Sequence, residues 1–427
     1  MTRSARRPLA TVAKAAAAVV AASFVALAGA APASADIVRD YEYWLGDYGF
    51  TTAWNTSRGE GVTVAIIDTG VNGAVAELAG VVIGGTDVSG VGTPDGQTPV
   101  GEDDTHGTMV ASLLAGRGTG DGNGVIGVAP EADLLTVSVA FGEDLGVEKS
   151  NDDQIAEAVV WAVDNGADVI NMSLTRNTRD WPESWDDAFM YAFEHDVVVV
   201  AAAGNRAGGT TEVGAPATIP GVLTVAGVDK EKNASFDASS QGITIGVAAP
   251  SEDLVGVQPD GKTYVWSGTS GAAPLVSGLV ALVRSEYPDL DAANVIERVI
   301  RTADPNGHEV PSPLYGNGLI DPVAALTAEV PEIDPDTLVD GLAAWITLHR
   351  RADAAEEDPS TETPVVVPIA DPPLPRSDGA QTLLPTQWTL AYITVPLSLV
   401  AGFGTLAALL GIGATRHTRR TVRTREQ

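Results

Sequence analysis

The stretch Val62-Thr-Val-Ala-Ile-Ile-Asp68-Thr-Gly70 decides the fold. It is apolar almost throughout and rich in β-branched residues, which is typical of a strand buried on both faces of a parallel sheet. A carboxylate is seldom buried without a partner, so Asp68 at the carboxyl end of this strand needs one. The alternative for this residue, taken singly, is an Asp that caps the next turn.

Similar strand-like runs recur along the chain and alternate with helical patterns. We expect strands at Val62–Ile67, Leu134–Val139, Val169–Met172, Val197–Ala202 and Val222–Val228, and helices at Met109–Leu114, Ile155–Asn165, Trp185–Phe193 and Leu275–Tyr287. Alternation of this kind predicts an α/β fold of three layers, with right-handed crossovers, a mainly parallel sheet and helices on both faces. A site in such a fold lies at the carboxyl ends of the strands.

A second segment, Ser267-Gly-Thr-Ser270-Gly-Ala-Ala-Pro274, places a serine among small residues ahead of an apolar run that ends at Arg284. Because proline is tolerated in the first turn of a helix, we expect Ser270 at a helix N-terminus. There, unpaired main-chain N–H groups and the helix dipole stabilise negative charge on a bound carbonyl oxygen. A turn followed by an ordinary helix cap is the alternative.

A serine hydroxyl is a weak nucleophile and needs a neighbouring base. The chain has five histidines. His106 precedes a small-residue pair and then apolar residues at helical spacing, which places its imidazole at the start of a buried helix. The other four histidines lie in polar or basic surroundings or just before a strand, and we interpret them as surface or structural residues: His195, His308, His349 and His417.

Asp68, His106 and Ser270 occur in the order acid, base and nucleophile, which predicts a serine hydrolase. The blocks Asp68-Thr-Gly70, His106-Gly-Thr108 and Gly268-Thr-Ser270-Gly-Ala-Ala-Pro274 resemble those of the subtilisin-like serine peptidases, in order and spacing, over roughly residues 45–328. The resemblance implies a subtilisin-like fold and hydrolysis of peptide bonds through an acyl-enzyme. His106 would take the proton of Ser270, and Asp68 would orient the imidazole.

A fourth block, Ala201-Ala-Ala-Gly204-Asn205, resembles the family segment that carries the oxyanion-hole asparagine. The side-chain N–H of Asn205 would donate to the tetrahedral intermediate beside the main-chain N–H of Ser270. An asparagine between Gly and Arg is also a common turn residue.

The segment Val169-Ile-Asn171-Met-Ser173-Leu174 resembles the family strand that pairs with an extended peptide. The resemblance implies a substrate-binding set of Asn171, Ser173, Leu174, Ala203 and Gly204. Where many family members continue with two glycines, this chain has Thr175-Arg176. Together with Arg206, the rim of the site then carries two cations, which favours acidic or polar side chains near the cut; in the alternative, both arginines point to solvent.

Both ends of the chain carry membrane-targeting patterns. Residues 1–35 follow the order of a secretory signal peptide: basic residues, the alanine-rich stretch Ala15–Ala30, then Ala33-Ser-Ala35. Residues 388–415 contain no charged residue and are long enough to cross a bilayer. Five arginines follow in the tail, residues 416–427, so the positive-inside bias predicts a single-pass cell-membrane protein with a cytoplasmic C-terminus and an extracytoplasmic peptidase domain.

Three further segments complete the predicted organisation. Residues 36–60 form a short N-terminal extension, 61–328 the peptidase domain, and 329–387 an acidic, proline-rich linker interrupted by a helix near Leu338–Arg351, which we expect to pack on the domain rather than on a partner. An extension of about 25 residues is too short to fold as an independent inhibitory propeptide. This organisation and the closing segment Tyr315-Gly-Asn-Gly-Leu-Ile-Asp-Pro322 resemble the mycosins, membrane-anchored subtilases of type VII secretion systems, which commonly carry cysteines.

Composition limits the partners and cofactors. The chain has 25 Lys and Arg against 56 Asp and Glu, a net charge of −31, and no cysteine. The negative charge disfavours nucleic acid as a partner, and stability must come from a large core instead of disulfides. The expected mechanism requires no cofactor. Structural calcium is common in the resembling family, but Asp121-Gly-Asn123-Gly offers no complete ligand set, so no metal is assigned.

The sequence therefore predicts a membrane-anchored, extracytoplasmic serine endopeptidase that acts on proteins or peptides. Two alternatives remain open. One is a structural subunit of a type VII-like secretion complex with secondary peptidase activity, and the other is an esterase that uses the same triad. The complete triad argues against an inactive scaffold, and the peptide-pairing strand argues for peptide substrates.

Overall fold

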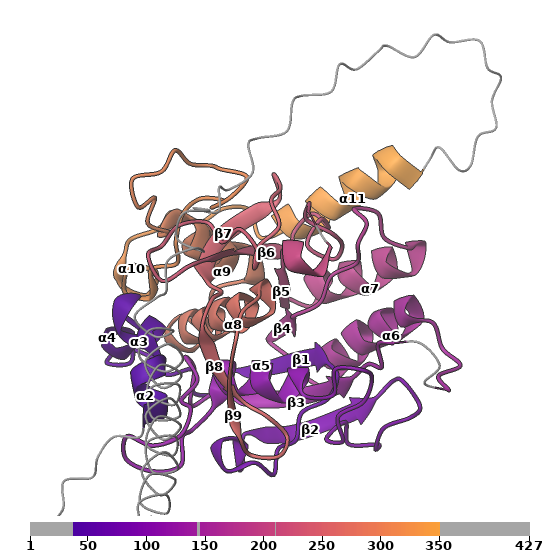
Figure 1. The fold of residues 1–427 in the computed structure, drawn as a ribbon. Coiled ribbons are helices and arrows are strands. Elements are labelled where there is room, and N and C mark those ends of the chain that lie inside the picture. Colours follow the sequence, from indigo (N-terminus) through magenta and orange to yellow (C-terminus); the bar gives the residue numbers. More distant parts are fainter. Residues whose placement is uncertain (1–36, 143–145, 210, 351–427) are drawn as a thin grey trace, which may run out of the picture. The chain divides into compact units, whose positions relative to one another are not determined.

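A parallel β-sheet of seven strands forms the centre of the fold (Figure 1). A computed structural model of the protein describes residues 37–142, 146–209 and 211–350. Within them the strand order is β2-β3-β1-β4-β5-β6-β7, and every neighbouring pair is parallel. The bounds are β1 Thr63–Asp68, β2 Val82–Asp87, β3 Asp133–Ser138, β4 Val169–Met172, β5 Val198–Ala202, β6 Leu223–Val228 and β7 Ile245–Pro250.

Helices cover the sheet on both faces. Every residue of β4, β5, β6 and β7 is buried, and successive residues of a strand point to opposite faces, so neither face is open to water. The helices contact one another in two groups: α8 contacts α5, α9 and α10, and α7 contacts α6 and α11. Their bounds are α5 His106–Ala115, α6 Asn151–Asp164, α7 Glu183–Glu194, α8 Thr269–Glu286, α9 Ala292–Arg301, α10 Pro322–Thr327 and α11 Thr337–His349.

The predicted α/β architecture is confirmed, and all five predicted strands and four predicted helices are present. Several features were not predicted: the edge strand β2, the strand β7, the amphipathic helix α9, the short helix α10, three short helices in the N-terminal segment, and an antiparallel hairpin of β8 (Leu254–Val257) and β9 (Thr263–Trp266). The expectation that Pro274 lies in the first turn of its helix is wrong. The helix α8 begins at Thr269, so Pro274 lies inside it, in the second turn, although Ser270 is in the first turn as predicted.

The N-terminal segment packs into the domain. It forms three short helices, α2 Ile37–Tyr41, α3 Tyr43–Asp47 and α4 Phe50–Ala53. Trp44 and Phe50 are fully buried in the main hydrophobic core. The indole of Trp54 donates to the Val128 carbonyl (2.8 Å), and the hydroxyl of Tyr43 donates to the Glu252 carbonyl (2.9 Å). This segment is thus part of the domain's core.

The helix α11 packs on α7 at the other end of the described chain. The indole of Trp345 stacks on that of Trp181, with ring centroids 4.0 Å apart, and Arg350 Nε lies 2.7 Å from Asp186 Oδ2. The packed domain therefore extends beyond residue 328 to the last described residue, at 350.

The predicted signal peptide (residues 1–35), most of the linker, the predicted membrane helix (388–415) and the basic tail (416–427) lie outside the described residues. Within the ranges that the structure describes, none of the helices combines the length and the apolar character needed to cross a bilayer.

Glu42 is an unusual ionisable group in the N-terminal segment. It is 3% exposed, its Oε1 accepts the main-chain N–H of Ile126 (2.8 Å), and its Oε2 lies 3.3 Å from Arg39 Nη1. Burial raises the pKa of Glu42 to about 8, although both partners oppose the change. The folded protein therefore binds a proton here that the unfolded chain releases at a much lower pH.

Replacing Glu42 by glutamine tests this burial. Between about pH 5 and pH 8 the folded state holds the Glu42 proton and the unfolded state does not, so stability due to this group falls as pH rises through that window. Glu42→Gln retains an oxygen acceptor for Ile126 and removes the titration. We expect the difference in melting temperature, Glu42→Gln minus wild type, to become more positive from pH 5 to pH 8.5 in thermal unfolding. The exposed Asp40→Asn is the matched control, and a pH-independent difference for Glu42→Gln would contradict the burial argument.

Candidate active site

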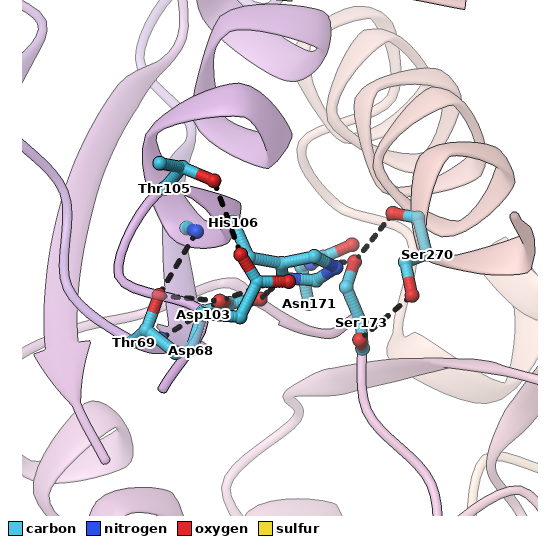
Figure 2. A network of polar contacts seen from close by, with 9 residues as sticks. Asp68, Thr69, Asp103, Thr105, His106, Asn171, Ser173 and Ser270 are labelled. Carbon is cyan, nitrogen blue, oxygen red and sulfur yellow. Dashed lines mark hydrogen bonds and ion pairs between the residues drawn. The ribbon is translucent and has the colours of Figure 1, made fainter. Parts of the chain in front are cut away.

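The predicted acid, base and nucleophile come from three separate elements and lie in one polar network (Figure 2). Asp68 is the last residue of β1, His106 is the first residue of α5, and Ser270 is the second residue of α8. Parallel strands end at the same edge of the sheet, and α5 and α8 begin there. The site therefore lies at the carboxyl edge of the sheet, as expected for this architecture.

The carboxylate of Asp68 holds the imidazole of His106. Asp68 is 2% exposed, and its Oδ1 and Oδ2 lie 2.8 and 3.0 Å from His106 Nδ1. Oδ1 also accepts the main-chain N–H of Thr69 (2.7 Å), and the Thr69 hydroxyl accepts the N–H of Gly107 (3.1 Å). These bonds tie the end of β1 to the first turn of α5, so the acid and the base are fixed relative to each other.

The environment of His106 favours its protonated form. Burial works against the charged imidazolium, but the charge of Asp68 and its hydrogen bond to Nδ1 outweigh burial, with a further contribution from Asp103. The pKa of His106 therefore lies above its ordinary value. Asp103 also accepts from the hydroxyl of Thr105 (3.1 Å), and its carbonyl accepts the N–H of His106 (3.2 Å), so the acidic run before α5 supports the helix start.

Trp266, which the sequence did not single out, packs against His106. The indole and the imidazole form a T-shaped pair, with ring centroids 5.6 Å apart and an interplanar angle of 73°. Trp266 ends the hairpin strand β9, four residues before Ser270. This contact adds to the Asp68 bond in limiting the rotation of the imidazole. The only sequence signal for this role is its nearness to Ser270.

Pro274 and Ser173 together position Ser270. Proline has no N–H, so the Ser270 carbonyl, four residues before Pro274, lacks its helical donor. The hydroxyl of Ser173 donates to that carbonyl instead (2.8 Å), and the Ser270 hydroxyl in turn donates to the Ser173 carbonyl (3.1 Å). Among the described residues no hydrogen bond joins the Ser270 hydroxyl to His106. In this state of the site, the hydroxyl is held on the β4 side.

Two hydrogen-bond donors at the start of α8 have no acceptor among the described residues, namely Nδ2 of Asn205 and the main-chain N–H of Ser270. Asn205 Oδ1 accepts both the N–H (2.8 Å) and the hydroxyl (2.9 Å) of Thr269, which turns Nδ2 of Asn205 away from these groups. The N–H of Gly271 donates to the Gly268 carbonyl. Within the described part of the chain, the N–H of Ser270 has no acceptor, as is usual in the first turn of a helix. Thr269, 0% exposed, is the residue that fixes the orientation of the Asn205 amide.

Of the five predicted substrate-binding residues, four are buried and one, Leu174, is partly exposed. Asn171 is 0% exposed, and its amide bonds Ser173 Oγ (3.0 Å) and Ser277 Oγ (2.9 Å), so this side chain supports β4 from inside the core. Ala203 and Gly204 are buried, and the Gly204 N–H donates to the Thr269 hydroxyl (3.0 Å). Leu174 is partly exposed, and its main-chain N–H and C=O have no partner among the described residues.

The remaining candidates have ordinary structural partners. The rings of His195, His308 and His349 pack on Tyr191, Tyr315 and Trp345 respectively, and His417 lies outside the described residues. The carbonyl of Asn123, in the candidate calcium loop, accepts from Arg39 Nη2 (3.2 Å). Across the described ranges, no group of three or more His, Asp or Glu side chains is arranged to hold a metal ion.

Comparison with known proteins identifies the family. Residues 59–318 match the sequence model of the Subtilase family. This chain belongs to the subtilase family. An intracellular serine protease of Paenibacillus polymyxa is 34% identical to this subtilase over 277 residues, which span 62% of this chain and 81% of that protein. Mycosin-3 of Mycobacterium tuberculosis is 35% identical over 334 residues, 65% of this chain and 70% of that protein.

Solved structures agree with the sequence comparison. The structure of the MycP3 protease from the type VII (ESX-3) secretion system is similar to this subtilase with a TM-score of 0.58 and 35% identity, covering 67% of this chain and 88% of that chain. The expected fold and family are therefore confirmed. The protein is a subtilisin-like, mycosin-like serine endopeptidase, a hydrolase that acts on proteins or peptides.

Removing the carboxylate of Asp68 should change the titration of His106. Asp68→Asn retains the shape of the side chain but loses the charge that favours imidazolium, whereas the burial that opposes it remains. We expect the pKa of His106 to fall below that of wild type, measured by NMR titration of the ring protons. Asp103→Asn, which removes a weaker contribution, should lower it less. An unchanged pKa in Asp68→Asn would show that the pair does not control the imidazole.

Proposed function

We propose that this subtilase is a membrane-anchored, extracytoplasmic endopeptidase whose catalytic triad is Asp68, His106 and Ser270. The observation that carries the proposal is the Asp68–His106 pair, 2.8 Å between Oδ1 and Nδ1, in one network with a serine at the start of α8. A buried carboxylate on Nδ1 leaves Nε2 of the imidazole to act as the base.

Attack on a peptide bond begins when the Ser270 hydroxyl leaves the Ser173 carbonyl and turns to His106. Catalytic hydrogen bonds are often long or absent before substrate binds, so the observed Ser270–Ser173 bond is compatible with this step. His106 takes the Ser270 proton as Oγ attacks the carbonyl carbon, and Asp68 stabilises the imidazolium. The proton then passes to the leaving amine, and water hydrolyses the acyl-enzyme. These proton transfers use the three side chains and water and require no cofactor; calcium stays unassigned.

Two donors would stabilise the oxyanion of the tetrahedral intermediate. The first is the main-chain N–H of Ser270, which has the positive end of the α8 dipole behind it. The second is Nδ2 of Asn205, held in place through the bonds of its Oδ1 to Thr269. Both are fixed before substrate arrives, so their orientation costs no reorganisation during the reaction.

The main chain at Leu174 would pair with an extended substrate. Its N–H and C=O lie just beyond the last ladder pair of β4 with β5, Met172 with Ala201. A peptide that adds alongside this segment would form main-chain hydrogen bonds and present alternate side chains to it. This mode favours a peptide over a small ester.

The predicted location and partners rest on the ends of the chain and on its relatives. Residues 1–35 and 388–415 have the patterns of a signal peptide and a membrane helix, and the similar MycP3 protease belongs to a type VII secretion system. We therefore propose that the catalytic domain is held outside the cell membrane, beside subunits of such a system. A mainly structural role in that complex is the second candidate, favoured by the same relatives.

Replacing the proposed nucleophile tests the reaction. Ser270→Ala should lose labelling by a fluorophosphonate probe, and its kcat on a casein-like substrate should fall by about 10⁶-fold, a magnitude measured in subtilisin itself. Ser285→Ala, on the same helix with a hydroxyl that donates to the Glu60 carbonyl, is the matched control and should keep both activities. Labelling of wild type without any proteolysis would count against the endopeptidase. If secretion survives Ser270→Ala but fails on deletion of the chain, the structural role is favoured.

Replacing Asn205 tests the oxyanion donors separately. Asn205→Leu removes Nδ2 together with the Oδ1 that accepts from Thr269, and we expect kcat to fall by about 10²–10³-fold, the effect known for the corresponding loss in subtilisin, with little change in KM. The exposed Asn165→Ala, which loses only a bond to the Trp161 carbonyl, is the control and should leave kcat unchanged. A variant Asn205→Leu with wild-type kcat would exclude Asn205 from the oxyanion hole.

A further inference from the structure

Arg206, the residue directly after Asn205, has a guanidinium group that is buried without a hydrogen-bond partner. Its Nε, Nη1 and Nη2 are all shielded from solvent, and none of them makes a hydrogen bond. Three other arginines of the described chain have a buried Nε without a partner, but their Nη atoms bind carbonyl or carboxylate oxygens: Arg39, Arg284 and Arg298. Arg206 thus differs from them in having no acceptor at all.

The surroundings of Arg206 leave its charge uncompensated. The guanidinium lies over the ring of Phe236, with Cζ 5.8 Å from the ring centroid. The exposed carboxylate of Asp237 acts on it only from a distance and forms no ion pair with it. Burial lowers the pKa of Arg206, and Asp237 offsets this only in part. A buried charge without a partner is costly, so this arrangement is one that a ligand carboxylate would stabilise.

The other arginine near the site is already neutralised. Arg176 Nη1 bonds the carboxylate of Asp152 at the start of α6, and its guanidinium lies over the ring of Trp185, with Cζ 5.5 Å from the centroid. The expectation that two cations face the substrate is therefore wrong for Arg176, because α6 and α7 hold its charge. Of the two, only Arg206 has a guanidinium free to bind an acid.

We propose that Arg206 binds a carboxylate of the substrate, so that the enzyme prefers a Glu or Asp side chain beside the cleaved bond. This inference rests on the proposed function, in which Asn205 holds the carbonyl under attack. Because Arg206 is the next residue and an extended peptide advances about 3.3 Å per residue, the acid belongs to the few residues on either side of the cut. The guanidinium is already shielded from water, so an ion pair formed there meets a lower dielectric than at the surface.

The segment that follows Arg206 is exposed and loosely surrounded. Arg206 begins a single 3₁₀ turn, Arg206–Gly208, followed by Gly209, and residues 207–209 are exposed. No atom lies within 4 Å of the position where a side chain on Gly208 or Gly209 would begin. An acid can reach the guanidinium only if this turn shifts, and at Gly208 and Gly209 no packed side chain holds the turn in place.

Paired peptides test the preference. The peptides form pairs that differ only by Glu or Gln at a single position, and that position is scanned over the residues flanking the cut. At one of the scanned positions, the wild-type full-length enzyme should cleave the Glu peptide with a kcat/KM at least about tenfold higher than the Gln peptide. The reason is that hydrogen bonds to charged groups are among the strong ones. Arg206→Gln should reduce this ratio to about 1. Arg206→Glu should reverse it in favour of Lys at the same position. Arg206→Lys, which keeps the charge, should retain part of the preference.

The control variant is Arg176→Gln, which removes an arginine already bound to Asp152 and should leave the Glu-to-Gln ratio as in wild type. Labelling of Ser270 by a fluorophosphonate probe reports whether each variant retains a folded site. A wild-type enzyme that cleaves Glu and Gln peptides equally would overturn the role of Arg206 but not the peptidase. Binding of the same peptides to Ser270→Ala separates the role of Arg206 from the peptidase activity. A preference for Glu in binding of about tenfold, abolished by Arg206→Gln, supports the inference even if turnover is absent. Equal binding of the Glu and Gln peptides overturns it.

Discussion

The ion pair of Asp68 and His106 is the interaction on which the site depends. A carboxylate at the end of a fully buried strand cannot be left without partners, and this one has the Thr69 N–H and the His106 imidazole. The Thr69 hydroxyl extends the same network to Gly107, so the start of α5 is fixed to the end of β1. The bonds that stabilise the buried carboxylate therefore also fix the position of the base. The helix α5 in turn packs on α8, which carries Ser270.

The position of Ser270 depends on a missing hydrogen bond. Pro274 removes the donor that would satisfy the Ser270 carbonyl, and Ser173 at the end of β4 supplies the replacement. Because Ser173 is itself bound by Asn171, and Asn171 by Ser277 on α8, the strand and the helix are joined by a closed set of bonds. A proline that would only weaken an ordinary helix here orients the first turn toward the sheet. The same set places Asn171 in a supporting position, away from any substrate.

The sequence predicted the sheet, and it singled out Asp68, His106 and Ser270, because these signals are local. A β-branched run that ends in Asp68 and a serine among glycines each point to one structure, and His106 is the histidine that begins an apolar helical pattern. What the sequence did not predict depends on contacts between distant segments. The start of α8 was misplaced because Pro274 is compensated by Ser173, about a hundred residues earlier. Trp266 was not singled out, because its nearness to Ser270 is a weak signal and its role comes from the hairpin that brings it to His106.

The burial of the N-terminal segment bears on whether it could act as a removable inhibitory propeptide. An inhibitory propeptide must be able to leave the enzyme, whereas Trp44 and Phe50 lie fully inside the core and Trp54 and Tyr43 donate hydrogen bonds to main-chain carbonyls of the domain. Truncating one buried aromatic side chain costs about 3–5 kcal/mol, and a whole domain is stable by only about 5–15 kcal/mol. Removing the segment would thus consume most of the stability of the fold. Burial therefore holds the described N-terminal segment in the enzyme, and at the site itself the Ser270 hydroxyl must leave the Ser173 carbonyl before it can reach His106.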